Sequence, residues 1–189
     1  MRAPELQPPS PFFEAQRERL RAAARLGPVL DVACGRGRHA LAAAELGAHV
    51  VAIDRSPAFL SELQLRARER ALRIDPVRGD LEAPAALPVR PSCFGAVLVF
   101  RFLHRPLAGP LAAALRPGGL LLYETFTERQ REVHRGPSNP DFLLREGELR
   151  RLFAGLDVLD YEECRVEGAF PQHVARLAAR RPVAHTSGA

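Results

Sequence analysis

The chain has 189 residues, of which 47% are hydrophobic and 26% are charged, and this balance is typical of a folded globular protein. The formal net charge is +5 and every basic residue is an arginine, so nucleic acid and small anions stay open as partners. The arginines alternate with glutamates, which is typical of solvated helix faces. No apolar run is long enough to cross a bilayer, and the proline-rich first residues lack a signal-peptide core. We therefore expect no membrane association and a cytoplasmic location.

The three cysteines, Cys34, Cys93 and Cys164, are far apart in the sequence. They form no CxxC pair, and an odd, scattered set fits neither a disulfide framework nor a zinc site. We therefore expect three free thiols and no metal centre.

Short apolar runs alternate with helical stretches along most of the chain, and turn residues separate them. In chain order, the pattern predicts a helix over 12–25, a strand over 29–32, a helix ended by Gly47, a strand over 50–53, a helix over 57–72, strands over 74–78 and 94–100, a helix over 106–115, a strand over 120–124, a helix over 146–153, and strands over 158–163 and 174–179.

The alternation of strand and helix predicts right-handed crossovers and a largely parallel sheet with helices on both faces. The chain ends on two consecutive strands, which we expect to form an antiparallel edge. No composition shift marks a linker, so a single domain over 1–189 is expected. The polar segment 127–144 is long for a loop, and such segments often cover binding sites. We expect it to cover the substrate side of the sheet together with an N-terminal helical stretch, 1–26.

Glycines and acidic residues follow the first three predicted strands. Asp31 lies just before Gly35 and Gly37, and glycines at such a turn let a ligand approach the backbone of the next helix. Asp54 ends the second strand, where a carboxylate can accept both hydroxyls of a ribose. Asp80 ends the third strand, where it could accept from an adenine amino group. Each acid alone also fits a helix cap or a surface charge, but three at the carboxyl ends of consecutive strands favour a nucleoside site.

Four motifs, VLDVACGRGRHA, VVAID, RGDLE and RPGGLLLYE, occur in the order typical of class I S-adenosylmethionine-dependent methyltransferases. The resemblance covers about residues 27–126, and the stretch NPDFLLREGEL is also similar to the small bacterial tellurite-resistance (TehB-like) group. It implies an α/β fold, a Rossmann-like doubly wound seven-stranded sheet that is mostly parallel, with the last strand antiparallel. It also implies S-adenosylmethionine as cofactor, S-adenosylhomocysteine as product, and an acceptor that could be tellurite or another small molecule.

The resemblance further implies which residues hold the cofactor. Asp31 lies near the methionyl amino group, Asp54 holds the ribose hydroxyls, and Asp80 flanks the adenine. The full implied set is Asp31, Cys34, Gly35, Gly37, Asp54, Arg55, Asp80, Leu81, Phe100 and Arg101.

The identity of any catalytic residue is left open by the sequence. A sulfonium is already an activated methyl donor, so an in-line displacement mainly requires alignment. A base is needed only where the acceptor must lose a proton, and the candidates are His104, Tyr123 and Glu124. Arg101 and Arg105 are candidates to neutralise an anionic acceptor. For His104 and for both arginines, a structural role such as a salt bridge stays open.

Several alternatives to a small-molecule methyltransferase remain. The basic composition favours an RNA or DNA methyltransferase, but base-methylating members commonly carry Asn/Asp-Pro-Pro-aromatic where this chain has residues 100–103, Phe-Arg-Phe-Leu. A cofactor-binding protein without catalysis is a second alternative. A dehydrogenase is a third, although little chain is left for a substrate domain. We expect a small-molecule acceptor as the partner, and a monomer or homodimer.

Overall fold

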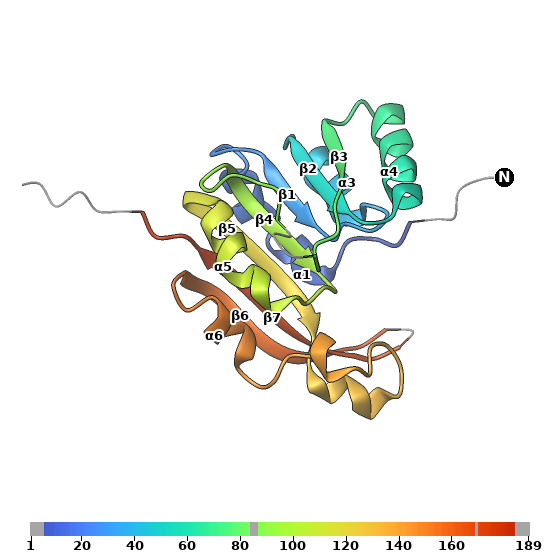
Figure 1. Ribbon diagram of the computed structural model, residues 1–189, viewed down its shortest axis with the longest axis vertical. Helices are drawn as coiled ribbons and strands as arrows, with labels where there is room; N and C mark the ends of the chain where they lie inside the picture. Colours follow the sequence, from blue (N-terminus) through green and yellow to red (C-terminus); the bar gives the residue numbers. More distant parts are fainter. Residues whose placement is uncertain (1–5, 84–86, 169, 184–189) are drawn as a thin grey trace, which may run out of the picture.

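The computed structural model describes residues 6–83, 87–168 and 170–183, which build a seven-stranded sheet with helices on both faces (Figure 1). The order of the strands across the sheet is β3-β2-β1-β4-β5-β7-β6. The strands are β1 (Val29–Val32), β2 (Val50–Asp54), β3 (Ile74–Arg78), β4 (Phe94–Phe100), β5 (Leu115–Phe126), β6 (Asp157–Val166) and β7 (Gln172–Arg180).

The strands β3, β2, β1, β4 and β5 are paired in parallel, whereas β7 is antiparallel to both β5 and β6. The last strand therefore runs against all the others, which confirms the prediction from the sequence. The chain moves outward from β1 to β3 and then returns to place β4 on the other side of β1. The segments that leave β1 and β4 diverge at this point, and ligands of open α/β sheets bind in the crevice that results.

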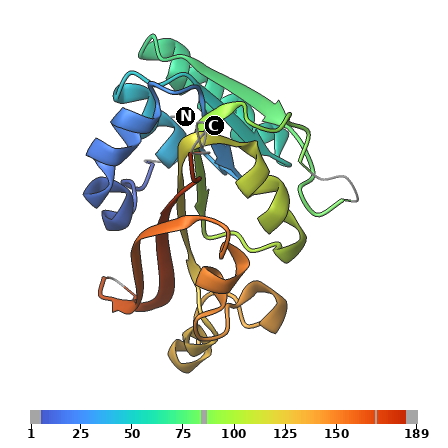
Figure 2. The same ribbon diagram turned by 90° about the vertical axis from the view of Figure 1, so that its left-hand side faces the viewer.

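Helices cover both faces of the sheet (Figure 2). They are α1 (Pro11–Ala15), α2 (Arg17–Ala23), α3 (Arg38–Glu45), α4 (Pro57–Glu69), α5 (Ala108–Ala114) and α6 (Glu148–Leu152), with the 3₁₀ helices η1 (Arg105–Leu107), η2 (Glu128–Val133) and η3 (Pro140–Phe142). Within the described ranges, no helix has the length and apolar character that a membrane crossing requires.

Strand β4 shows how the core is divided between the two faces. Ala96, Leu98 and Phe100 pack in the cluster that contains α1, α2 and α3, whereas Val97 and Val99 pack in the cluster that contains α5 and α6. Every residue of β4 is buried. This burial on both faces explains why the strand is a continuous apolar run without alternation.

The predicted N-terminal helix over 12–25 is divided into α1 and α2 at Gln16. The backbone of Gln16 leaves helical geometry (φ −101°, ψ 7°), and its buried side-chain amide donates to Asp160 Oδ2 of β6 at 2.9 Å. The break and this bond to a distant strand have no signal in the local sequence. Residues 1–5 of the predicted cover over 1–26 lie outside the described residues.

The segment 127–144 is tied together at its base. Glu128 N donates to Leu144 O at 2.9 Å, and Leu144 N donates to Phe126 O at 3.0 Å. Between these ties the segment contains η2 and η3, and it extends beyond the carboxyl end of β5 in both views (Figure 1 and Figure 2). It therefore lies at the edge of the sheet where the ligand crevice is expected.

Candidate functional site

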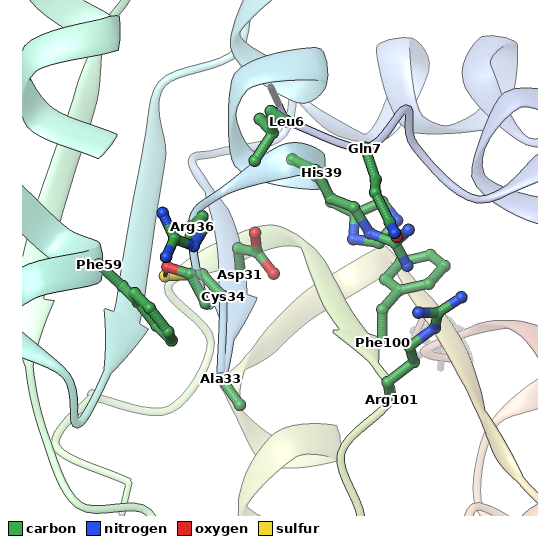
Figure 3. Close-up of a pocket in the computed structure, with 12 residues that line it drawn as sticks. Leu6, Gln7, Asp31, Ala33, Cys34, Arg36, His39, Phe59, Phe100 and Arg101 are labelled. Carbon is green, nitrogen blue, oxygen red and sulfur yellow. Dashed lines mark hydrogen bonds between the residues drawn. The ribbon is translucent and has the colours of Figure 1, made fainter. Parts of the chain in front are cut away.

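A cleft runs along the carboxyl ends of β1, β2, β3 and β4. It consists of two adjoining cavities of about 520 and 240 Å³, here called the first and the second chamber. Ala33 and Phe59 line both chambers, so the two are continuous. The first chamber extends to Phe100 and Arg101 after β4 (Figure 3), and the second extends to Asp80 after β3.

Asp31 on β1 is a buried carboxylate in the wall of the first chamber. Its side chain is only 2% exposed, and its Oδ2 atom has no hydrogen-bond partner within the described part of the chain. Burial raises the pKa of Asp31 to about 7, although the Ala40 backbone and the charge of Arg38 act in the opposite direction. An unpaired buried carboxylate is costly, so this atom is suited to bind a ligand cation such as a primary ammonium group.

Arg38 provides the opposite charge in the same chamber. It is half-buried at the start of α3, and burial together with the charge of Arg101 lowers its pKa. An acid and a base that face one chamber complement the ammonium and carboxylate groups of an amino acid. The chamber therefore fits the methionyl end of the cofactor that the sequence motifs imply.

The two glycines of the first turn have different roles. Gly35 has φ +55° and lines the first chamber, and a Cβ built on it would meet nothing within 4 Å. Gly37 has φ +79°, but its Cβ would lie 2.3 Å from Leu63 Cδ1. Gly35 thus keeps the backbone accessible to a ligand, whereas Gly37 is required for the packing of α4 against the turn. Cys34 lies beside them in the chamber wall, and burial raises the pKa of its thiol.

Asp54 connects the first turn to the end of β2. Its Oδ2 atom accepts from Gly35 N at 2.7 Å, and its Oδ1 atom accepts from Ser56 N at 2.8 Å. Each carboxylate oxygen can accept a second hydrogen bond, so the side chain can still take ribose hydroxyls from the second chamber, which it lines. Asp54 therefore also orders the turn, a structural role that its position in the sequence does not reveal.

The second chamber combines polar groups at its rim with apolar walls. Leu81 is buried, and together with Phe102 and Ala33 it forms the apolar surface. Asp80 is exposed, with Oδ1 accepting from Glu82 N at 3.0 Å. Arg55 is also exposed, with its guanidinium 3.4 Å from Glu82 Oε2. An apolar chamber with carboxylate acceptors in its lining suits an adenosine group. All ten residues of the implied cofactor set except Gly37 line one of the two chambers.

The N-terminal segment forms one wall of the first chamber through Leu6 and Gln7 (Figure 3). It is fixed by Ser10, whose N–H donates to His39 Nε2 at 3.1 Å and whose hydroxyl donates to Glu124 Oε2 at 2.9 Å. The His39 ring stacks on Phe100 with centroids 3.8 Å apart. Burial and two nearby arginines lower the pKa of His39 to about 2, so it is a neutral acceptor.

Most of the candidate catalytic residues have other partners in the structure. The Tyr123 hydroxyl is buried and donates to Phe102 O at 2.9 Å, and burial raises its pKa. Glu124 is also buried and accepts from Ser10 and from Arg176. His104 lines neither chamber.

The two candidate arginines differ from each other. Arg105 has the structural role that the sequence left open, because it forms two hydrogen bonds with Glu148, at 2.6 and 3.0 Å, and two more with backbone carbonyl oxygens. Arg101 has φ +59°, is exposed, and lines the first chamber. Arg101 is therefore the one member of the candidate list that faces the cleft in the described chain.

Sequence reasoning missed three groups of residues that line the cleft. Arg38 had a signal, because it directly follows the glycines of the first motif. Phe59 and Phe102 follow Asp54 and β4 at short distance, but an aromatic residue there is equally consistent with the core. Leu6 and Gln7 lie in the N-terminal stretch that was expected to cover this side of the sheet, but the sequence gives no signal for these two residues in particular.

Comparison with known proteins agrees with this geometry. Residues 29–119 match the family model described as a methyltransferase domain. An uncharacterised protein of Mycobacterium tuberculosis is 36% identical over 108 residues, which are 53% of this chain and 38% of that protein. A ubiquinone biosynthesis O-methyltransferase of Xanthomonas campestris is 37% identical over 102 residues, which are 51% of this chain and 42% of that enzyme. The chain thus spans less than half the length of these curated relatives.

Solved structures show the same fold. The crystal structure of TehB from Haemophilus influenzae matches with a TM-score of 0.71 and 22% identity, covering 85% of this chain and 60% of that chain. The resemblance found in the sequence motifs is thereby confirmed. Residues 29–119 match a family model of methyltransferase domains, and the chain has the class I fold of the S-adenosylmethionine-dependent methyltransferases.

Proposed function

We propose that the protein binds S-adenosylmethionine in the cleft and transfers its methyl group to a small-molecule acceptor. The observation that carries the proposal is the Oδ2 atom of Asp31, a buried carboxylate oxygen without a partner in the described residues, in the first motif of a methyltransferase domain. Such an atom is explained if a ligand supplies its missing donor.

Each end of the cofactor has a matching part of the cleft. In this proposal Asp31 binds the methionyl ammonium group and Arg38 binds the methionyl carboxylate, since both line the first chamber. Asp54 accepts the ribose hydroxyls, and Leu81 and Phe102 enclose the adenine in the second chamber. Arg101, which follows β4 and lines the first chamber, would begin the acceptor side of the site.

The chemistry required of the chain is alignment and exclusion of water. Bound S-adenosylmethionine supplies an activated methyl group. The residues of the cleft hold the donor in one orientation, and orientation of this kind contributes about 7–11 kcal/mol of barrier reduction. Because Tyr123 and Glu124 are engaged in other bonds, we propose that an acceptor proton leaves to solvent and that neither residue acts as the base.

A small acceptor is supported by the shape of the site and by one relative. The ubiquinone biosynthesis O-methyltransferase that matches the chain has a name that indicates a small-molecule acceptor. The segment after β4, Phe100 to Leu103, lacks the tetrapeptide of base-methylating enzymes. An RNA methyltransferase is the alternative, and steeply salt-dependent RNA binding in a filter assay would favour it, because phosphate contacts release counterions.

The experiment is a calorimetric titration with S-adenosylhomocysteine of wild type and of Asp31→Asn. Loss of one charge-assisted hydrogen bond is expected to weaken binding about 10–100-fold. Asp31 is a cleaner probe than Asp54, whose oxygens also hold Gly35 N and Ser56 N. Asp157→Asn is the matched control, because Asp157 is exposed at the start of β6. The proposal fails if wild type does not bind, or if both variants bind as wild type does.

A further inference from the structure

A third cavity of about 400 Å³ adjoins the cleft, and Arg101 lines both. It lies between the end of β5, the start of β7 and the segment 127–144. The side chains that matter here are Arg101, Arg135, Phe126, Phe170, Gln130 and Gln172. None of them belongs to the residues proposed to hold the cofactor, except Arg101 at the boundary.

The cavity has two cationic side chains and no acidic one. Neither Arg101 nor Arg135 forms an ion pair with a carboxylate of the described chain, and no aspartate or glutamate lines the cavity. Two arginines that line the cleft, Arg36 and Arg55, are paired with Glu62 and Glu82, whereas Arg38 is assigned to the methionyl carboxylate. Two guanidinium groups without counter-charges concentrate small anions in the space between them.

Aromatic rings lie directly against the two cations. The guanidinium of Arg135 is 3.7 Å from the centroid of the Phe170 ring, and that of Arg101 is 6.0 Å from the centroid of Phe126. Phe170 is 50% exposed, so one part of its ring is accessible to a ligand. A planar anion fits such a lining, because its ring can stack on phenylalanine while its charge faces arginine.

The walls of the cavity are held by hydrogen bonds between distant residues. Gln130 is 2% exposed, donates to Arg135 O at 2.8 Å and accepts from His173 N at 2.7 Å. Gln172 Oε1 accepts from Arg101 Nη2 at 3.0 Å. The segment that carries Arg135 is thus fastened to β7, and the Arg101 side chain is oriented at the junction of the two cavities.

We propose that this third cavity is the acceptor site and that it takes a small planar carboxylate, an aryl carboxylate. The inference rests on the proposed function, since it names the acceptor of the same reaction. The carboxylate is held between Arg135 and Arg101, and a nucleophilic oxygen, nitrogen or sulfur of the same molecule faces the first chamber. Its lone pair forms the new bond to the methyl carbon, the carbon–sulfur bond breaks with its electrons remaining on sulfur, and any proton on the nucleophile passes to water.

The test is a titration of the protein, loaded with S-adenosylhomocysteine, with benzoate and 2-naphthoate, and with their uncharged amides. The carboxylates are expected to bind at least about 10-fold more tightly than the amides, as for other charge-assisted contacts. Arg135→Gln should weaken carboxylate binding by about 10-fold or more and Phe170→Ala by a smaller factor. Both side chains are on exposed residues, so the fold should persist, as circular dichroism can verify.

Controls separate this inference from the proposed function. Arg90→Gln removes one exposed arginine at the opposite end of β4 and should leave carboxylate binding unchanged. Equal binding of carboxylates and amides, or no effect of Arg135→Gln, overturns the acceptor site. Phosphate or selenite binding as tightly as the aryl carboxylates overturns the choice of a planar acceptor. Failure to bind S-adenosylhomocysteine is a separate result that overturns the methyltransferase proposal, and the carboxylate titration is then run on the unloaded protein.

Discussion

Replacing Asp31 by asparagine should stabilise the ligand-free protein while it weakens ligand binding. Burial raises the pKa of this carboxyl group from 3.8 to about 7. At about 1.36 kcal/mol per unit, the shift corresponds to roughly 4 kcal/mol by which the ionised form destabilises the fold relative to the protonated form. Asparagine has the same shape and no charge. Above about pH 7 we therefore expect Asp31→Asn to raise the free energy of unfolding by up to about this amount.

The dependence on pH has a definite sign. The folded-state pKa of Asp31 lies above the unfolded-state value, so between about pH 4 and pH 7 the folded protein holds a proton that the unfolded chain releases. The stabilisation that protonated Asp31 gives the folded state relative to ionised Asp31 is complete below about pH 4 and is lost as the pH rises to about 7. Urea unfolding of both proteins at about pH 5 and about pH 8 isolates this contribution, because the other groups titrate alike in both. A variant less stable than wild type at the higher pH would refute the reasoning.

The affinity for the ligand should rise with pH, whereas the contribution of Asp31 to stability falls. A methionyl ammonium group pairs with the ionised carboxylate, so below about pH 7 Asp31 must lose a proton before it can bind. We expect the affinity of wild type for S-adenosylhomocysteine to fall by up to about 10-fold for each pH unit between about 7 and 5. Calorimetry should show a flat and weak profile for Asp31→Asn. Parallel profiles for the two proteins would contradict an ion pair at this position.

Three further substitutions test the packing around the cleft. Gly37→Ala places a Cβ 2.3 Å from Leu63 Cδ1 at φ +79°, so urea unfolding should show a loss of about 2–4 kcal/mol; an unchanged midpoint would contradict the packing. The low pKa of His39, about 2, predicts that wild type loses up to about 1.36 kcal/mol per pH unit as the pH falls below about 6.5. His39→Gln should reduce this acid sensitivity, and equal slopes would argue against a neutral His39. Arg105→Gln breaks the bonds to Glu148 and should lower the free energy of unfolding by about 1–3 kcal/mol. The affinity for the cofactor should stay unchanged, and a weakened affinity would show that Arg105 contributes to the cleft.

The strands and the residues at their tips could be predicted from the sequence because their signals are local. Strands over 29–32, 74–78 and 94–100 have the predicted bounds. The first and the third are largely apolar runs, and the second, which mixes apolar and charged residues, is ended by the turn residues Gly79 and Asp80. Parallel pairing then brings their carboxyl ends to one edge without further assumptions. Asp31, Asp54 and Asp80 reach one cleft for this reason.

The partners of individual side chains could not be predicted, because they depend on contacts between distant residues. Arg105 is 43 positions from Glu148, and the sequence gives no reason to prefer this pair over an open site. The Tyr123 side chain lies on the face of β5 that packs in the core, and its hydroxyl donates to a backbone carbonyl oxygen 21 positions away. The break at Gln16 depends in the same way on Asp160 of a late strand. A candidate list from sequence therefore contains residues whose hydrogen-bonding capacity is used within the fold.

Asp31 and Asp54 differ in how far the fold itself satisfies their oxygens. Both lie near the carboxyl ends of neighbouring parallel strands, but the two oxygens of Asp54 already accept backbone N–H groups, whereas Asp31 Oδ2 has no donor within the described chain. The fold thus uses Asp54 to fix the turn and tolerates the buried charge of Asp31, which destabilises the ligand-free state. A ligand that supplies the missing donor gains the interaction without reorganising the site, because the turn is already fixed. In the proposed site, the instability at Asp31 and the order at Asp54 are therefore two parts of one preformed arrangement.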